Sequence, residues 1–402
     1  MYEFALKEYG KALKGMKKAI ERKYDIRMAL IACLLVFCFE SLQGNPNAAV
    51  ANAKSGLTVL QGFMASRGPH CIMTHCFDSY EGIEADIASA FAGLDIQVMF
   101  FLDTRTEDVH RAAIARFENS VANMPGVFKH LEECMAYWFT IQRRNYHFYI
   151  LARDALSNPA VSARKQDQWR NQNLVANPAR SGCFYDGTFQ EPVEDFESRF
   201  RDTLRMQMEI YRDDIRRWSR ASALVFGQVE AVGGKEQKVI KALLNIHANL
   251  SHIEGAGVFM AKDTEYDAFL PEFTTIVELS EEIYPYMSRD SNSVFRFFLG
   301  IVNPLSAVGF RCRNAHIRGR AIKLLQRGPY REGIWDALGV GKLADWIRGV
   351  EEEGMDENGY IPESKRAVMR LFDVDLNSKV ALLGCKSPSE KGQKFIRKEV
   401  VE

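Results

Sequence analysis

Apolar residues recur at intervals of three and four along almost the whole chain. Near the N-terminus, Leu6, Tyr9, Leu13, Met16 and Ile20 form one such stripe opposite a lysine-rich face. Residues with this spacing lie on one face of an α-helix, and few folds other than packed helices can bury such stripes. The same spacing predicts further helices over residues 26–42, 48–65, 79–101, 106–118, 126–156, 190–226, 236–260 and 266–288, with two more stripes around Leu324 and Trp346.

Other fold classes find little support in the sequence. No segment sustains the apolar–polar alternation that is typical of a half-buried β-strand. A repeat of fixed length is also missing, which argues against a helical solenoid. Apolar residues make up 47% of the 402 residues, enough for a sizeable core. The sequence therefore predicts an all-α protein, a multi-helical bundle made of two packed helical halves.

One long stretch interrupts the helical pattern. Residues 158–192 contain three prolines and many polar amides, and they show no periodicity. A stretch of this length is typical of either a functional loop or a linker, and we favour an irregular linker. It would separate an N-terminal half, residues 1–157, from a C-terminal half, residues 193–386. We expect residues 387–402 to form a charged tail.

The overall charge and the apolar runs exclude some partners. The chain has 52 basic and 52 acidic residues, so no global field draws it towards nucleic acid or anionic lipid. The longest apolar run, residues 28–39, is shorter than the roughly 20 residues that a membrane-spanning helix needs. We interpret it as a buried core helix that ends at Gly44, and we expect no membrane partner.

Two local basic patches remain. Between Arg311 and Arg331 there are seven basic residues and no carboxylate, and residues 7–27 contain eight basic and three acidic residues. Such patches could meet phosphates or an acidic partner. Alternatively, they form ion pairs inside the protein, and the acidic residues between Glu351 and Glu357 are suitable partners for the first patch. We favour internal pairing.

A metal site is not expected. Cys71 and His75 would share one face of a helix, but the neighbouring His70 and Cys76 would point elsewhere. Zinc requires four converging ligands, and the chain offers no second pair with matching spacing. We therefore expect no stoichiometric zinc and no cofactor.

The sequence also lacks a convincing motif of a common enzyme class. Asp213 and Asp214 are followed by arginines at helical spacing, which indicates ion pairs rather than a metal-dependent acidic site. Gly339, Gly341 and Ala344 imitate a dinucleotide-binding fingerprint, but a helical pattern precedes them where a strand is required. We interpret them as a turn between helices. The sequence predicts no catalytic residues and no enzyme.

Three stretches resemble a known family. Residues 303–354, from NPLSAVGFRCRNAHIRGR to DWIRGVEEEG, resemble the closing signature of the fungal-specific transcription factor domain. Residues 9–45 resemble its opening helices, and EYDAFLPEF at residues 265–273 resembles a weaker third marker. Together they bracket most of the chain. In that family the helical region follows a six-cysteine zinc cluster that reads DNA, and it is taken to regulate, to bind partners or to sense ligands.

This chain departs from the family pattern in one respect. Its eight cysteines nowhere show the clustered CxxC spacing of the zinc module. The resemblance therefore implies a transcription-regulator-like protein without its own zinc cluster. Either the DNA-binding half has been lost, or an upstream exon is missing from the gene model. A nuclear location, or otherwise the cytoplasm, and a role in fungal secondary metabolism are further implications.

The resemblance also implies partners. We expect a protein partner or a full-length zinc-cluster factor, with a small-molecule effector and a homodimer left open, and no sequence-specific DNA binding by this chain alone. Two alternatives remain. One is a helical enzyme or small-molecule binder of a secondary-metabolite pathway that reuses the fold. The other is a dimerisation partner of a full-length factor.

The signature residues are expected to be architectural and to fix the turn between two packed helices. They are Arg311, Cys312, Arg313, Arg318, Arg331, Glu332, Gly333 and Trp335. Trp335 should be a buried anchor between the helix of Leu324 and the helix of Trp346. If the basic face is solvated, reversing the charge of Arg318 and Arg320 should leave folding nearly intact.

Overall fold

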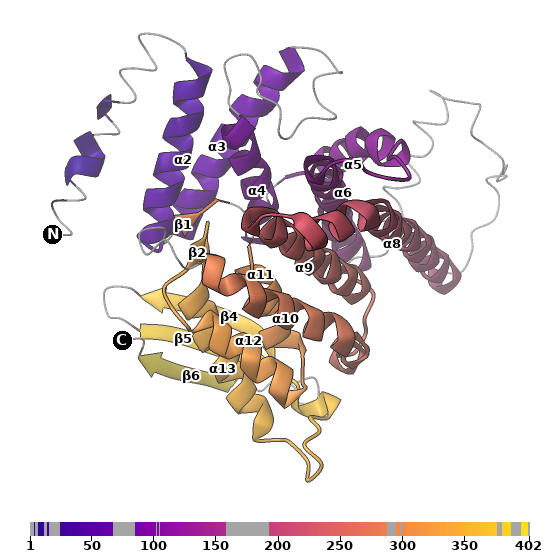
Figure 1. Cartoon of the computed structure of the whole chain (residues 1–402). Coiled ribbons are helices and arrows are strands. Elements are labelled where there is room, and N and C mark those ends of the chain that lie inside the picture. Colours follow the sequence, from indigo (N-terminus) through magenta and orange to yellow (C-terminus); the bar gives the residue numbers. More distant parts are fainter. Residues whose placement is uncertain are drawn as a thin grey trace.

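The computed structural model describes residues 4, 7–11, 14–15, 25–66, 85–101, 103, 105–157, 193–287, 295–297, 300–375, 380–386 and 395–400. Helices dominate these residues, and the predicted all-α class is confirmed (Figure 1). Residues 67–84 and 158–192, on which the His70–Cys76 motif and the expected linker fall, lie outside the described part of the chain.

The N-terminal helices pack around one apolar cluster. They are α2 (Ile26–Leu42), α3 (Pro46–Ser66) and α4 (Ala85–Phe101). The Asp25 side chain accepts two backbone N–H groups of the first turn of α2, which is the usual N-cap arrangement. Gly44 follows the helix with φ 72°, a conformation that favours glycine, so the predicted terminator is confirmed.

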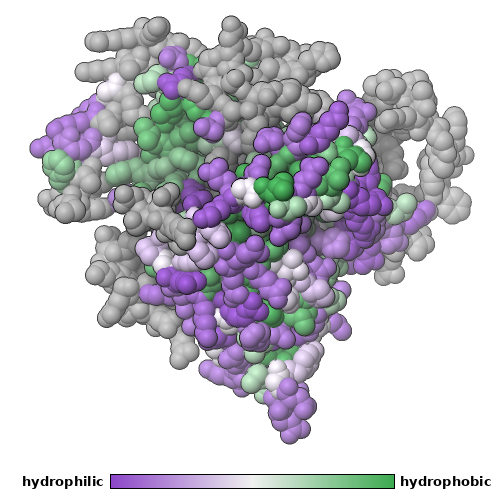
Figure 2. Space-filling view, in the orientation of Figure 1, coloured by the Kyte–Doolittle hydropathy of each residue, from purple (hydrophilic) through white to green (hydrophobic). Residues whose placement is uncertain are grey.

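Only one side of α2 is buried, although the sequence indicated a fully buried helix. Met28, Leu35 and Leu42 recur every seven residues and are 45%, 58% and 53% exposed. Figure 2 shows an apolar patch in this region. Tyr9 stacks on Phe39 at the end of α2, with ring centroids 3.7 Å apart. None of the described helices has both the length and the apolar composition needed to cross a membrane.

The middle of the chain forms a second helical group, which consists of α5 (Glu107–Ala122), α6 (Leu131–Ser157), α8 (Val193–Val232) and α9 (Lys235–Gly257). Trp138 of α6 and Trp218 of α8 are almost completely buried, with ring centroids 4.8 Å apart. The Trp218 indole N–H donates to the carbonyl oxygen of Cys134 over 2.8 Å. These contacts fix the long helix α8 against α6.

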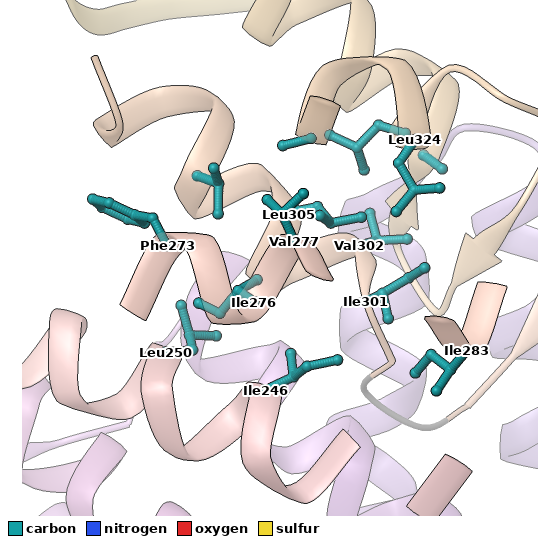
Figure 3. Close-up of a cluster of buried hydrophobic side chains, with 14 of the residues drawn as sticks. Ile246, Leu250, Phe273, Ile276, Val277, Ile283, Ile301, Val302, Leu305 and Leu324 are labelled. Atoms are coloured by element: carbon teal, nitrogen blue, oxygen red, sulfur yellow. The ribbon is translucent and has the colours of Figure 1, made fainter. Parts of the chain in front are cut away.

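The C-terminal helices build the largest apolar cluster together with α9 (Figure 3). They are the 3₁₀ helix η3 (Asp263–Phe269), α10 (Leu270–Met287), α11 (Val302–Arg311), α12 (Ala315–Leu325) and α13 (Ala337–Glu352). A Cβ atom on Gly309 would lie 2.8 Å from the Cβ of Ala344, so glycine permits the close approach of α11 and α13.

The glycine motif that imitates a dinucleotide fingerprint belongs to this packing. Gly339 and Gly341 lie in the first turns of α13, and the expectation of a turn between helices was wrong. The N–H of Gly339 donates to the side chain of Asp336, which caps the helix. A Cβ atom on Gly341 would lie 2.8 Å from the Gln326 side chain at the end of α12.

Two small sheets were not foreseen. In the first, β1 (Phe295–Arg296) pairs in parallel with β2 (Arg331–Glu332), which pairs antiparallel with β3 (Trp335–Asp336). The second is an antiparallel sheet of β4 (Val368–Asp375), β5 (Val380–Lys386) and β6 (Phe395–Val400). The register of β4 shifts between Met369 and Leu371, which interrupts the alternation of its residues. Strand β6 lies within the stretch that was expected to be a charged tail.

Candidate functional site

The basic segment around α12 pairs with carboxylates inside the protein. Arg313 and Arg318 reach Glu351 of α13 at 2.5 and 2.7 Å. Glu351 is fully buried and also accepts the backbone N–H of Ala367 over 2.7 Å. The Arg318 Nε–H donates to the carbonyl oxygen of Gly309 over 2.8 Å. The predicted pairing with the acidic run is therefore confirmed for Glu351, and it ties α12 to α11 and α13.

Further arginines of the segment are paired with other helices. Arg311 contacts Asp263 of η3 at 2.5 Å, and Arg320 contacts Glu281 of α10 at 2.6 Å. An arginine engaged with a carboxylate is not free to bind a phosphate group. Arg311, Arg313, Arg318 and Arg320 consequently hold helices together instead of standing as unpaired cations.

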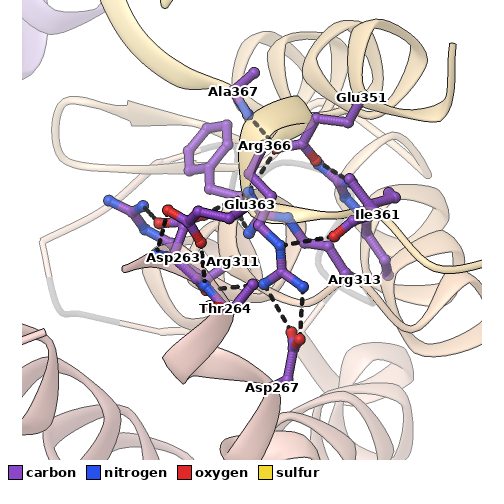
Figure 4. Close-up of polar contacts among 12 residues, drawn as sticks. Asp263, Thr264, Asp267, Arg311, Arg313, Glu351, Ile361, Glu363, Arg366 and Ala367 are labelled. Carbon is purple, nitrogen blue, oxygen red and sulfur yellow. Dashed lines mark hydrogen bonds and ion pairs between the residues drawn. The ribbon is translucent and has the colours of Figure 1, made fainter. Parts of the chain in front are cut away.

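The arginine–carboxylate network extends to the residues that follow α13 (Figure 4). The fully buried Arg366 donates two hydrogen bonds to Asp267, at 2.9 and 2.5 Å. Glu363, in the 3₁₀ helix η4 (Glu363–Lys365), accepts the N–H groups of Asp263 and Thr264. Sequence reasoning missed Arg366, because it lies beyond the segment that carries the resemblance. Asp267 lies within the third marker, which could have indicated it.

Glu332 caps the N-terminus of α11 from strand β2. Its side chain is fully buried and accepts the backbone N–H groups of Gly300, Ile301 and Val302 at 2.9, 2.7 and 3.1 Å. Burial raises the pKa of Glu332 to about 7, although the three N–H groups act in the opposite direction. Glu332 was expected to be architectural, and its role is to cap α11 from a distant strand. The N-cap residue of α11, Ile301, has no side chain that could do so.

The residues on either side of Glu332 contact the N-terminal helices α2 and α4. Arg331 donates to the carbonyl oxygen of Ser41 at the end of α2 over 2.6 Å. Gly333 has φ 58°, and a Cβ atom there would overlap the side chain of Gln97 in α4. Gln97 accepts the N–H of Ile334 over 3.2 Å. This short segment therefore links the N-terminal helices to the C-terminal helices.

Trp335 has a different place from the one expected. It lies on strand β3, before α13 begins, and it is half-buried. Its ring packs against the large C-terminal cluster, which includes Leu324, and against the N-terminal cluster of α2, α3 and α4. The prediction of a buried anchor between α12 and α13 was wrong, because Trp335 is half-buried and belongs to the junction of the two clusters.

A second buried ionic cluster lies between α4 and α6, and sequence reasoning did not find it. Asp95 is buried and pairs with Arg105 at 2.7 Å and Arg143 at 2.8 Å. Burial raises the pKa of Asp95, but the two guanidinium groups outweigh burial and hold it well below its usual range. Nearby, Nδ1 of His110 lies 2.8 Å from Nδ1 of His147, and burial lowers the pKa of His147 to about 3.

The described residues include the Asp213–Asp214 motif but not the His70–Cys76 motif. Asp213 pairs with Arg216 at 2.5 Å and Asp214 with Arg217 at 2.8 Å, so the predicted helical ion pairs are confirmed. Within the described residues, no cluster of three or more His, Cys, Asp or Glu side chains could hold a metal ion.

A cavity of about 180 Å³ lies beside the arginine–carboxylate network. Its walls combine apolar and polar side chains, among them Tyr266, Leu270, Phe273, Cys312, Arg313 and Ile361. The cavity thus opens between η3, the start of α10, the end of α11 and the chain after α13. It is the best candidate for a binding site in the described part of the chain.

Comparison with known proteins gives one informative match. No family model matches the chain, and no solved structure matches it. Over 109 residues the chain is 28% identical to the aspercryptin biosynthesis cluster-specific transcription regulator of Emericella nidulans. The match covers 25% of this chain and 18% of that protein. Part of the chain therefore resembles a fungal transcription regulator, and the matched relative is not an enzyme.

Proposed function

We propose that this chain is a transcription-regulator-like protein that acts through a helical domain of the fungal-specific transcription factor kind. The observation that carries the proposal is the match to a regulator dedicated to a biosynthetic gene cluster. The proposal includes a role in fungal secondary metabolism and a nuclear location, and the same match supports both. The chain acts through a protein partner, for which a full-length zinc-cluster factor is the first candidate.

The contacts of the basic segment support action through a partner rather than through DNA. A protein that reads DNA needs exposed Arg or Lys side chains that can reach phosphates and base edges. Here Arg313 and Arg318 are buried against Glu351, and Arg311 is paired with Asp263. The net charge of zero gives no compensating long-range attraction.

A second candidate is a small-molecule binder of a biosynthetic pathway, with or without enzymatic activity. The cavity beside Arg313 favours this alternative. Fold alone does not decide between the two, because one fold can host several functions. A dimerisation partner of a full-length factor is a special case of the first proposal.

Deletion of the gene in its native fungus separates these candidates. If the chain is a regulator, the deletion changes the transcripts of a group of genes, and the wild-type gene restores them. A gene with Arg318→Glu should not restore them, because that variant is expected to lose its fold. Arg320→Glu is the matched control and should restore the transcripts. Unchanged transcripts combined with the loss of one metabolite would favour a pathway enzyme and contradict the proposal.

A further inference from the structure

We propose that the exposed face of α8 pairs with the same face of a second copy of this chain, with the two helices antiparallel. The proposal goes beyond the proposed function, because it assigns the surface, the orientation and the register of a homodimer, and it does not depend on the regulatory role. Three observations carry it: exposed apolar side chains along one stripe of the helix, charges that complement themselves, and the mismatch of the neighbouring registers.

One stripe of α8 lies on the surface of the protein. The helix packs mainly against α6 and α9, and Ile215 and Trp218 lie on its buried side. Residues that alternate by three and four positions form the surface stripe: Thr203, Met206, Ile210, Asp213, Arg217, Arg220, Leu224 and Gly227. Side chains with this spacing point in one direction and form the seam between the two helices of a coiled coil.

Three large apolar side chains on this stripe are exposed. Met206 is 70%, Ile210 51% and Leu224 59% exposed. They lie on both sides of a charged centre that consists of Asp213 and Arg217. Removing such side chains from water on association is favourable, and apolar residues at helical spacing fit the face of another helix.

The stripe complements itself when a second copy runs antiparallel. If the two-fold axis passes midway between Asp213 and Arg217, Asp213 of each copy faces Arg217 of the other. Met206 of each copy then faces Leu224 of the other. The remaining facing pairs are Ile210 with the aliphatic part of Arg220, and Thr203 with Gly227.

The local ion pairs of α8 leave room for this contact. Asp213 pairs with Arg216, and Arg217 pairs with Asp214, within the same helix. A carboxylate can accept hydrogen bonds from a second arginine, and a guanidinium group has five N–H donors. Asp213 is exposed and Arg217 is partly exposed, so a second copy can reach both side chains.

Other arrangements of the two helices bring like charges together or separate the apolar side chains. A parallel pair would set Asp213 against Asp213 and Arg217 against Arg217. An antiparallel pair shifted by one heptad would set Arg217 against Arg220 in one direction, and Met206 against Arg217 in the other. Like charges in contact disfavour association. The sequence of charges along α8 therefore favours a second copy in one orientation and one register.

Charge reversal tests the pairing on the full-length protein by sedimentation velocity over a concentration series. Wild-type protein should show a monomer–dimer equilibrium. Asp213→Arg sets a second arginine against Arg217, and Arg217→Glu sets a glutamate against Asp213, so each variant alone should dimerise at least about tenfold more weakly. An equimolar mixture of the two should associate again, because each variant supplies the charge that the other lacks. Glu278→Arg, at an exposed position of α10, is the control and should dimerise like the wild type.

A cross-link tests the orientation and keeps the wild-type charges, so it decides the question even if a charge variant fails to fold. The variant carries both Thr203→Cys and Gly227→Cys, at exposed positions, and nothing lies within 4 Å of a Cβ atom on Gly227. The two positions are about 36 Å apart along one helix, too far for a link within one chain. Oxidation should link position 203 of one copy to position 227 of the other, and mass spectrometry of the digested dimer identifies the linked peptides.

Three results would overturn the inference. The first is a wild-type chain that stays monomeric up to about 1 mM. The second is a mixture of the two charge variants that associates no better than either alone. The third is a cross-link between two copies of position 203 or two copies of position 227, which indicates parallel helices. None of these results bears on transcript levels in the deletion strain, so the two proposals can fail separately.

Discussion

Arg318 and Arg320 are two residues apart on α12, yet their surroundings differ. Arg318 is buried against Glu351, whereas Arg320 meets Glu281 near the surface. Arg318→Glu should therefore lower the free energy of unfolding by about 3–5 kcal/mol, since it leaves two carboxylates buried together. Arg320→Glu should cost no more than about 1 kcal/mol. Urea denaturation of both variants measures the difference, and equal midpoints would contradict this account of the network.

The raised pKa of Glu332 predicts that the stability of the fold decreases as the pH rises. Its pKa in the folded protein, about 7, is above the ordinary value of 4.5, so the folded state holds the proton more tightly. The stabilisation is fully present below about pH 4.5 and is lost as the pH rises towards 7, by about 3 kcal/mol in total. Relative to Glu332→Gln, the wild type should lose stability between these pH values. Parallel pH profiles of the two proteins would exclude this role for Glu332.

The residues of the candidate site were only partly predictable from the sequence. The acidic run that begins in the last turn of α13 indicated that the basic segment pairs internally, but helix packing decides that Glu351 is the partner of Arg318. Arg366 and Asp95 gave no local signal, because their partners Asp267, Arg105 and Arg143 come from other elements. Contacts between distant segments do not leave a periodic pattern in a sequence.

Among the elements, the turn between β2 and β3 depends on one glycine. Gly333 combines φ 58° with a side-chain position that Gln97 occupies. Gly333→Ala should lower the free energy of unfolding by at least about 1 kcal/mol, because both the backbone and the Gln97 contact are strained. The control is Gly349→Ala in α13, where nothing lies within 4 Å of the added Cβ atom. That variant should gain about 0.5–1 kcal/mol in thermal or urea unfolding.

Helices were predicted more reliably than strands, for a physical reason. The second helix was expected over residues 26–42 and forms over Ile26–Leu42, since an N-cap at Asp25 and the glycine at 44 mark its ends. Strands β4 and β5 were missed. The shift of register in β4 breaks its alternation, and β5 reads as a short apolar run that a helix could equally contain.

For the whole molecule, weak DNA binding is the expected result. The chain has no net charge, and Arg311, Arg318 and Arg320 are engaged with carboxylates. The purified protein should bind random and selected duplexes with similar, salt-sensitive affinity. A titration across a salt series measures this. Nanomolar binding that depends on sequence at physiological salt would show that the chain reads DNA by itself.

The central claim is that the helical domain regulates transcription once it is brought to a promoter. The most direct measurement fuses the full chain to an unrelated DNA-binding domain and follows a reporter transcript in a filamentous fungal host. The account predicts that the fusion changes the reporter level relative to the DNA-binding domain alone, that Arg320→Glu preserves the change, and that the unfused chain has no effect. A fusion that accumulates to the same level, folds, and leaves the reporter unchanged would contradict the claim.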